Sequence, residues 1–250
     1  MTKLFLVIIL FFNPFVPDVK KLITEGDEFY EKFENQKALN IFQEAYKIAP
    51  DDFEVLLKLT RSYLDVGEEY MKNGDKGKAE FYYNKAIQFS ETMKLKFPEQ
   101  SETWAYLAAS NGDMATFKGS KDKIKYGALV EKYAKKAIEL DEKDTMAYVI
   151  LGLFYFELSK LNWFERTFAN TFLGKIPDGG LPEAEQNFKK ALQLEPEWIK
   201  PMYHLSEIYR EKDMNKEELA LLKKIVSLPE KNFRDKYLKV EARERLHELQ

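Results

Sequence analysis

The chain has 250 residues, of which 45% are hydrophobic and 32% charged, enough apolar side chain for a large folded core. Thirty-nine basic and 42 acidic residues leave a net charge of −3, so no global positive field favours nucleic-acid binding. Cysteine is absent and histidine occurs twice, which excludes disulfides, thiol catalysis and multi-histidine metal centres. With only 11 glycines and 9 prolines, the composition favours helices.

The chain begins with an apolar run from Leu4 to Phe12, followed by Pro14 and Pro17. Nine helical residues span about 14 Å, less than half of the ~30 Å hydrocarbon core of a bilayer. The run is typical of the hydrophobic region of a signal peptide, although no small residue marks a cleavage site. We therefore expect residues 1–17 to be a signal peptide or N-terminal anchor that exports the protein to a periplasmic or membrane-anchored location. A segment packed on the body, in a cytoplasmic protein, is the alternative.

A repeat of about 34 residues organises the rest of the chain. Its first copy carries small and aromatic residues at fixed spacings, followed by a proline: Leu22, Gly26, Phe29, Ala38, Phe42, Ala45 and Pro50. This spacing resembles the tetratricopeptide repeat, a pair of helices whose small residues allow close approach. We expect repeats over 19–52, 53–100, 101–144, 145–198 and 199–231.

The last segment, residues 232–250, is expected to be a capping helix that ends the core in water. Phe233, Tyr237, Val240 and Leu246 are predicted to form its apolar face. The predicted fold is all-α: a right-handed superhelical solenoid of about five tetratricopeptide helix pairs with long inserts and this C-terminal cap. An irregular helical bundle is the alternative.

Residues 101–228 carry a more specific pattern. Gly152 lies on an expected first helix, and Trp163, Phe164 and Arg166 follow in a long insert. This order resembles the regulator of microtubule dynamics family, a group of divergent tetratricopeptide proteins. The resemblance implies an all-helical binding protein without catalytic residues and, for a cytosolic chain, association with microtubules.

The first helix of each pair is expected to line the concave face of the solenoid, where a partner would bind. The candidate binding residues on this face are Tyr30, Arg61, Asp65, Val149, Leu153, Phe156, Lys200, Tyr203 and Arg210. Their mixed character suits a protein segment, a peptide or an elongated amphipathic ligand. Alternatively, Val149, Leu153 and Phe156 are simply buried under the insert.

The insert from Asn162 to Pro182 is rich in aromatic residues. Its candidate residues are Trp163, Phe164, Arg166, Phe168 and Phe172. It is either an extra helix folded over the core or a lid over the concave groove, with Arg166 at the rim as an anion contact.

A lysine-rich stretch covers residues 117–136, with a local net charge of +5. Its lysines are Lys118, Lys121, Lys123, Lys125, Lys132, Lys135 and Lys136. It could meet an acidic tail or an anionic membrane, or it is a solvated helix face.

The predicted function is a non-catalytic scaffold that binds a protein partner along its concave face, with no metal or cofactor. The alternative is an exported accessory protein that binds a small apolar or lipid-like ligand under the aromatic insert. Apart from the N-terminal segment, no contact with a membrane is expected, and the oligomeric state is not specified by the sequence.

Overall fold

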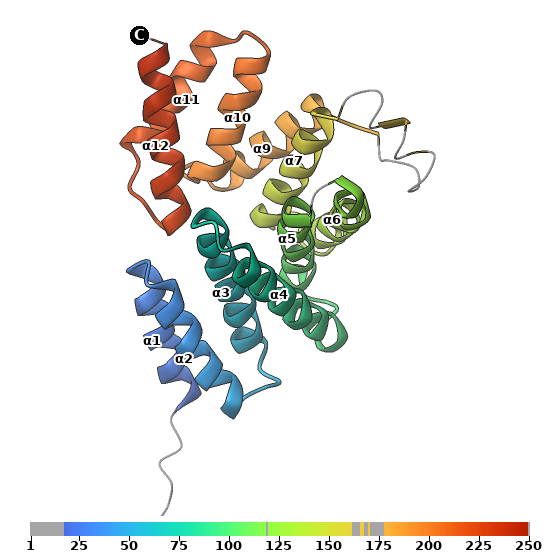
Figure 1. Cartoon of the computed structure of the whole chain (residues 1–250), viewed down its shortest axis with the longest axis vertical. Helices are drawn as coiled ribbons and strands as arrows, with labels where there is room; N and C mark the ends of the chain where they lie inside the picture. Colours follow the sequence, from blue (N-terminus) through green and yellow to red (C-terminus); the bar gives the residue numbers. More distant parts are fainter. Residues whose placement is uncertain (1–17, 119, 162–165, 168–169, 171–177, 250) are drawn as a thin grey trace, which may run out of the picture.

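The computed structural model describes residues 18–118, 120–161, 166–167, 170 and 178–249, with side chains omitted for residues 120–124. Within these ranges the chain forms eleven helices, labelled as in Figure 1. They form five consecutive pairs and one final helix. The pairs are α1 (Val19–Glu31) with α2 (Asn35–Ile48), α3 (Phe53–Lys72) with α4 (Lys76–Lys96), α5 (Ser101–Lys118) with α6 (Ser120–Leu140), α7 (Thr145–Ser159) with α9 (Leu181–Leu194), and α10 (Ile199–Glu211) with α11 (Asn215–Ser227), followed by α12 (Phe233–Glu248). The predicted all-α solenoid is confirmed.

Aspartate side chains fix where several helices begin. Asp18, Asp52 and Asp144 each accept a hydrogen bond from a backbone N–H in the first turn of α1, α3 and α7. Each carboxylate satisfies a donor that the helix itself leaves unpaired, and its charge suits the positive end of the helix dipole. These first helices therefore begin at the residue that follows an acidic cap.

Glycines allow close contact within the helix pairs. Gly26 of α1 lies against the Phe42 ring of α2, and Gly152 of α7 lies against the Phe188 ring of α9. A Cβ at Gly152 would lie 2.6 Å from Phe188 Cε1, closer than real Cβ contacts occur. Phe42 and Phe188 are both fully buried, so this contact forms the centre of its pair.

The first helices of successive pairs form the inner layer of the solenoid. The contacts α3 with α5, α5 with α7, α7 with α10 and α10 with α12 all join first helices directly, and α12 continues their row. In Figure 1 the pairs succeed one another in a curved stack. The inner layer lines the concave face, here called the groove.

Half of the apolar face predicted for the final helix is packed, since Phe233 is 6% exposed and Leu246 lies against the last hydrophobic cluster. Leu238, Ala242 and Leu246 pack on the hydrophobic cluster shared with α10 and α11. Tyr237 and Val240, predicted to be apolar contacts, are 39% and 43% exposed. The Lys72 ammonium lies 4.4 Å from the centre of the Tyr237 ring, so this side of α12 faces the end of α3. The prediction was wrong for Tyr237 and Val240, and Tyr237 lies instead beside Lys72 of α3.

Candidate functional site

Charged and phenolic side chains converge in the groove around α3 and α5. They come from five different inner helices, and we call them the groove cluster: Tyr30 of α1, Arg61, Asp65 and Glu68 of α3, Tyr106 and Asp113 of α5, Lys200 of α10, and Arg234 of α12. Four of them were predicted from the repeat register, namely Tyr30, Arg61, Asp65 and Lys200. The structure brings these four together with four further residues, Glu68, Tyr106, Asp113 and Arg234.

Arg61 is the link between the first two repeats. Its guanidinium lies 3.7 Å from the centre of the Tyr30 ring, and its Nη2 donates to Asp27 Oδ1 at 3.2 Å. Lys58 also pairs with Asp27, at 2.6 Å. A guanidinium over a phenol ring is a favourable cation–π contact. The aromatic and basic groups at this end of the groove are thus held in fixed positions before any partner binds.

Arg234 reaches the groove from the opposite end of the chain. Its Nη1 donates to Asp65 Oδ1 at 2.5 Å, and its Nε pairs with Glu68. Burial alone would lower the pKa of Arg234, but the two carboxylates outweigh it and raise the pKa. Figure 1 shows the start of α12 next to the end of α3. The solenoid is therefore closed across its groove by an ion pair.

Asp113 and Tyr106 of α5 belong to the same cluster and are half-buried. Burial, assisted by the Glu68 charge, raises the pKa of the Asp113 carboxyl to about 6. Burial also raises the pKa of the Tyr106 phenol, to about 12. Desolvation disfavours the charged form of both groups. Both groups therefore remain uncharged to a higher pH than they would in water.

The C-terminal half of the groove is partly covered by α12. Burial and the neighbouring Glu241 carboxylate raise the pKa of Tyr203. Lys200 is half-buried, and burial lowers its pKa. Arg210, at the end of α10, is exposed. Among Lys200, Tyr203 and Arg210, which were predicted in this half, only Arg210 is open to solvent.

The apolar candidates on α7 do not form an open surface. Val149 and Phe156 are each 2% exposed and belong to the central hydrophobic cluster, while Leu153 is half-buried against it. The assignment of Val149 and Phe156 to a binding face is therefore corrected: they pack the core. This removes the apolar lining on which the small-ligand alternative depended.

The aromatic insert falls mostly outside the described residues. Trp163, Phe164, Phe168 and Phe172 lie there, so the lid remains a prediction. Arg166 is described, and its Nη2 donates to the Leu158 carbonyl at 2.7 Å and to the Gly179 carbonyl at 3.5 Å. The Arg166 guanidinium therefore joins the two ends of the insert. The role of Arg166 as an anion contact remains a prediction.

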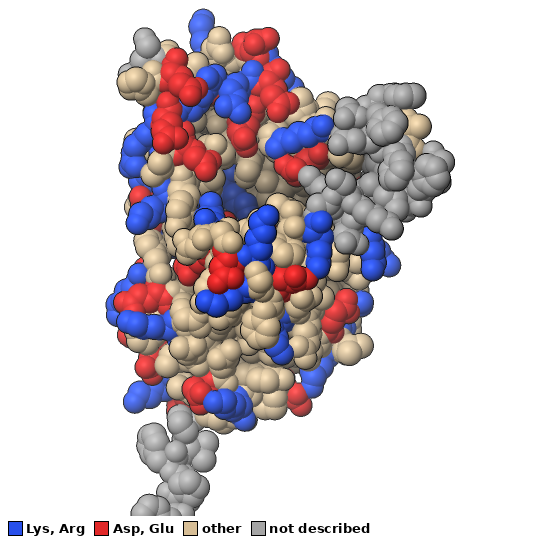
Figure 2. Space-filling model, viewed as in Figure 1, with Lys and Arg blue, Asp and Glu red and all other residues tan. Residues whose placement is uncertain are grey.

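The lysine-rich stretch lies along the end of α5 and on α6. Lys118 pairs with Glu80, Lys135 with Glu131, and Lys136 with Glu139. Lys125 and Lys132 are exposed, and the side chains of Lys121 and Lys123 are outside the described ones. Figure 2 shows acidic and basic residues interspersed over the visible face. Because these glutamates partly neutralise the lysines, the local positive charge is smaller than the one from which the basic patch was predicted.

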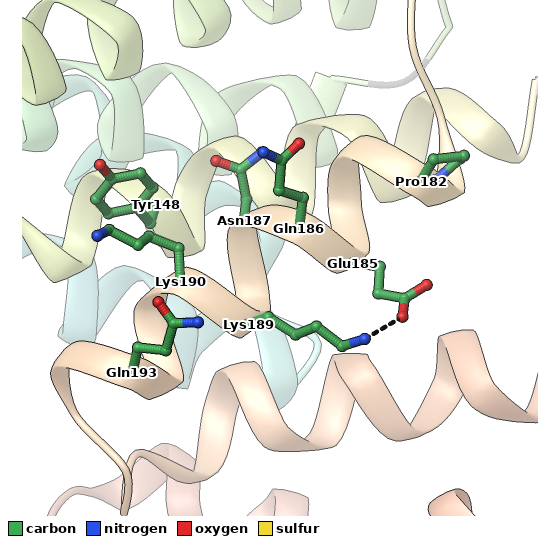
Figure 3. Close-up of a pocket in the computed structure, with 8 residues that line it drawn as sticks. All are labelled: Tyr148, Pro182, Glu185, Gln186, Asn187, Lys189, Lys190 and Gln193. Carbon is green, nitrogen blue, oxygen red and sulfur yellow. Dashed lines mark hydrogen bonds and ion pairs between the residues drawn. The ribbon is translucent and has the colours of Figure 1, made fainter.

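A shallow hollow of about 660 Å³ lies on the other side of the fourth repeat (Figure 3). Tyr148 of α7 and a row of polar side chains from α9 line it. Glu185 and Lys189 pair with each other across its edge at 2.5 Å, and the Lys190 ammonium lies 5.9 Å from the Tyr148 ring centre. Its groups mostly come from one helix and contact one another, so we regard the groove as the stronger candidate.

Half of the groove cluster was missed from the sequence. Glu68 follows Asp65 by one helical turn, so its place on the same face could have been found from helical spacing. Tyr106 and Asp113 required the register of the third repeat, which its weak signature left open. No sequence pattern identifies Arg234 as a groove residue, because its ion pairs with Asp65 and Glu68 depend on how far the superhelix turns between α3 and α12.

Comparison with known proteins supports the architecture. The family model described as regulator of microtubule dynamics protein 1-3 matches residues 22–250. Human regulator of microtubule dynamics protein 2 is 29% identical over 187 residues, covering 74% of this chain and 45% of that protein. Protein 1 of the same series from Bos taurus is 24% identical over 226 residues, covering 90% of this chain and 70% of that protein. The chain thus spans less than half of the human relative.

A solved structure shows the same fold. A thermophilic tetratricopeptide-repeat protein of Thermus thermophilus superposes with a TM-score of 0.63 at 19% identity, covering 90% of this chain and 98% of that one.

These relatives contradict the predicted export. They are named as regulators of microtubules, which are cytoplasmic filaments in the animals concerned. The prediction of an exported protein is therefore wrong. Residues 1–17, on which it rested, lie outside the described residues, and no helix in the described part has the length and apolar character to cross a bilayer.

Proposed function

Since the chain belongs to the regulator of microtubule dynamics protein 1-3 family, we propose that it is a cytoplasmic, non-catalytic scaffold that binds a protein partner along its groove and associates with microtubules. The matched model covers almost the whole solenoid, including α12. The names of the relatives motivate the microtubule part of the proposal, and the fold motivates the binding part.

The groove cluster is the observation that carries the choice of surface. Tyrosine and arginine dominate the energetics of many protein interfaces, and here Tyr30, Arg61 and Tyr106 lie side by side in the groove. Because α1, α3 and α5 each supply one of them, an extended segment would contact three repeats at once.

The proposal is tested by co-sedimentation with polymerised tubulin and by affinity capture of partners. Tyr106→Ala removes a half-buried groove side chain. Phe81→Ala is the matched control, because Phe81 is an aromatic residue of the outer helix α4 and is 55% exposed. Circular dichroism should first establish that both variants fold.

We expect the wild-type chain and Phe81→Ala to sediment with microtubules and to capture the same partners, and Tyr106→Ala to lose binding at least tenfold. Full retention by folded Tyr106→Ala would refute the groove as the binding surface. If the wild-type chain stays in the supernatant, its association with microtubules is refuted.

A further inference from the structure

The groove of the free chain already holds a basic side chain. Arg234 belongs to the first turn of α12, yet it pairs with two carboxylates that lie 166 and 169 residues earlier in the chain. The Asp65 side chain is 2% exposed and that of Arg234 is 20% exposed, so the contact is largely shielded from water. One end of the protein thus occupies a site built by the other.

Without Arg234, this site is acidic. Asp65 and Glu68 of α3 pair with its guanidinium, and the charge of Asp113 on α5 also helps to raise the pKa of Arg234. Arg61 of α3 pairs with Asp27, but Lys58 also neutralises Asp27, so Arg61 still offsets one negative charge near Asp65. Lys200 of α10 contributes one positive charge against three carboxyl groups. The α3–α5 surface therefore needs a cation to balance it.

The site also has hydrogen-bonding capacity that Arg234 does not use. Asp65 Oδ2 is buried and receives no hydrogen bond, although Oδ1 of the same carboxylate accepts from Arg234. A buried carboxylate oxygen without a donor is unfavourable. A guanidinium that approached both oxygens of Asp65 would satisfy it, since the planar fork of arginine matches a carboxylate in two parallel hydrogen bonds.

We propose that Asp65, Glu68 and Asp113 form a recognition site for an arginine side chain of the partner segment, and that Arg234 occupies this site in the free chain as an internal substitute. The partner arginine displaces Arg234 and bonds to both oxygens of Asp65. The rest of α12 stays in place, because Leu238 and Ala242 pack on the hydrophobic cluster of the last repeat. The proposal rests on the proposed function, in that it names the side chain by which the groove selects its partner.

The test uses N-acetyl-L-arginine amide as the probe and the full chain as the receptor. Arg234→Ala and Arg234→Gln both vacate the site, and the Gln variant keeps most of the side-chain stem. Arg243→Ala is the matched control, because Arg243 is an exposed arginine of the same helix. Binding is measured by NMR titration, with N-acetyl-L-citrulline amide as the uncharged probe of equal shape.

We expect both Arg234 variants to bind the arginine probe at least tenfold more tightly than the wild type and Arg243→Ala do. The citrulline probe should not bind, and adding Asp65→Asn to Arg234→Ala should abolish binding of the arginine probe.

Three results would overturn the proposal: no binding of the arginine probe to the folded Arg234 variants, equal binding of the citrulline probe, or loss of folding in both Arg234 variants. The last result would show that the ion pair is a structural tie that no partner can replace. Failure of this test leaves the Tyr106 experiment on the groove unaffected, so the two proposals can fail separately.

Discussion

Gly152→Ala should destabilise the fourth repeat, although alanine is the better helix former. The added Cβ would lie 2.6, 2.7 and 3.1 Å from three atoms of the Phe188 ring. Phe188 is fully buried, and its ring stacks on His204 with centroids 5.8 Å apart, so it has little room to move. The methyl group must therefore be accommodated by shifting α7 away from α9.

The two effects on stability have opposite signs. Overpacking of a core costs roughly 1–3 kcal/mol, whereas replacing glycine by alanine within a helix gains up to about 1 kcal/mol. The contacts of 2.6 and 2.7 Å place the overpacking cost in the upper part of its range, about 2–3 kcal/mol, so the net loss is about 1–2 kcal/mol. This loss corresponds to a fall in Tm of roughly 2–8 °C for a chain of this length. Neighbouring repeats share interfaces, so the whole stack should melt earlier.

Gly112→Ala provides the matched control for thermal and urea unfolding. Gly112 lies in α5, and a Cβ there would meet only Val130 Cγ2, at an ordinary 3.7 Å. It should raise stability by up to about 1 kcal/mol through helix propensity. Adding Phe188→Leu to Gly152→Ala should cost less than the sum of the two single changes. If Gly152→Ala is as stable as the wild type or Gly112→Ala, the overpacking argument is refuted.

Three further predictions concern charge and capping. Because the pKa of Asp113 is raised to about 6 in the fold, its ionisation destabilises the folded state as pH rises through 6. Asp113→Asn should therefore raise Tm at pH 8, and this gain in Tm should shrink toward pH 4. An equal gain at both pH values would contradict the prediction. Asp52→Ala should cost about 1 kcal/mol in urea unfolding by removing the cap of α3, whereas Asp52→Asn should cost little. Arg245→Met leaves the buried Glu218 carboxylate without its 2.7 Å partner and should lower Tm, and adding Glu218→Leu should recover most of the loss.

Local spacing predicted the helix pairs because, in the first two repeats, the glycine and the aromatic ring that contact each other lie on consecutive helices, a fixed number of residues apart. Gly26 precedes Phe42 by sixteen residues, and both are close in the structure. In the second repeat the same contact joins Gly67 and Tyr83, again sixteen residues apart, but two turns later along α3. The spacing within the contact is therefore kept, while its position in the repeat shifts along both lengthened helices.

The groove could be predicted only where the repeat register was firm. Tyr30 and Arg61 follow from helical position, since an inward residue of one first helix faces an inward residue of the next. Val149 and Phe156 hold equivalent positions and are nevertheless buried, because α5, α9 and α10 surround α7 on several sides. The contact of Arg234 depends on small rotations summed over four repeats, which no local pattern records.

The ion pair between Arg234 and Asp65 changes how this repeat protein is expected to fold and unfold. In an open array each unit depends only on its neighbours, so either end can fray alone. Here the contact spans 169 residues, and the entropy of closing so long a loop makes it a late event in folding. Once formed, the contact couples the opening of α3 to the opening of α12. Amide hydrogens in α3 and in the first turn of α12 should therefore exchange with solvent through the same opening. Because Lys72 of α3 also lies against the Tyr237 ring of α12, these two helices are expected to separate together rather than one at a time.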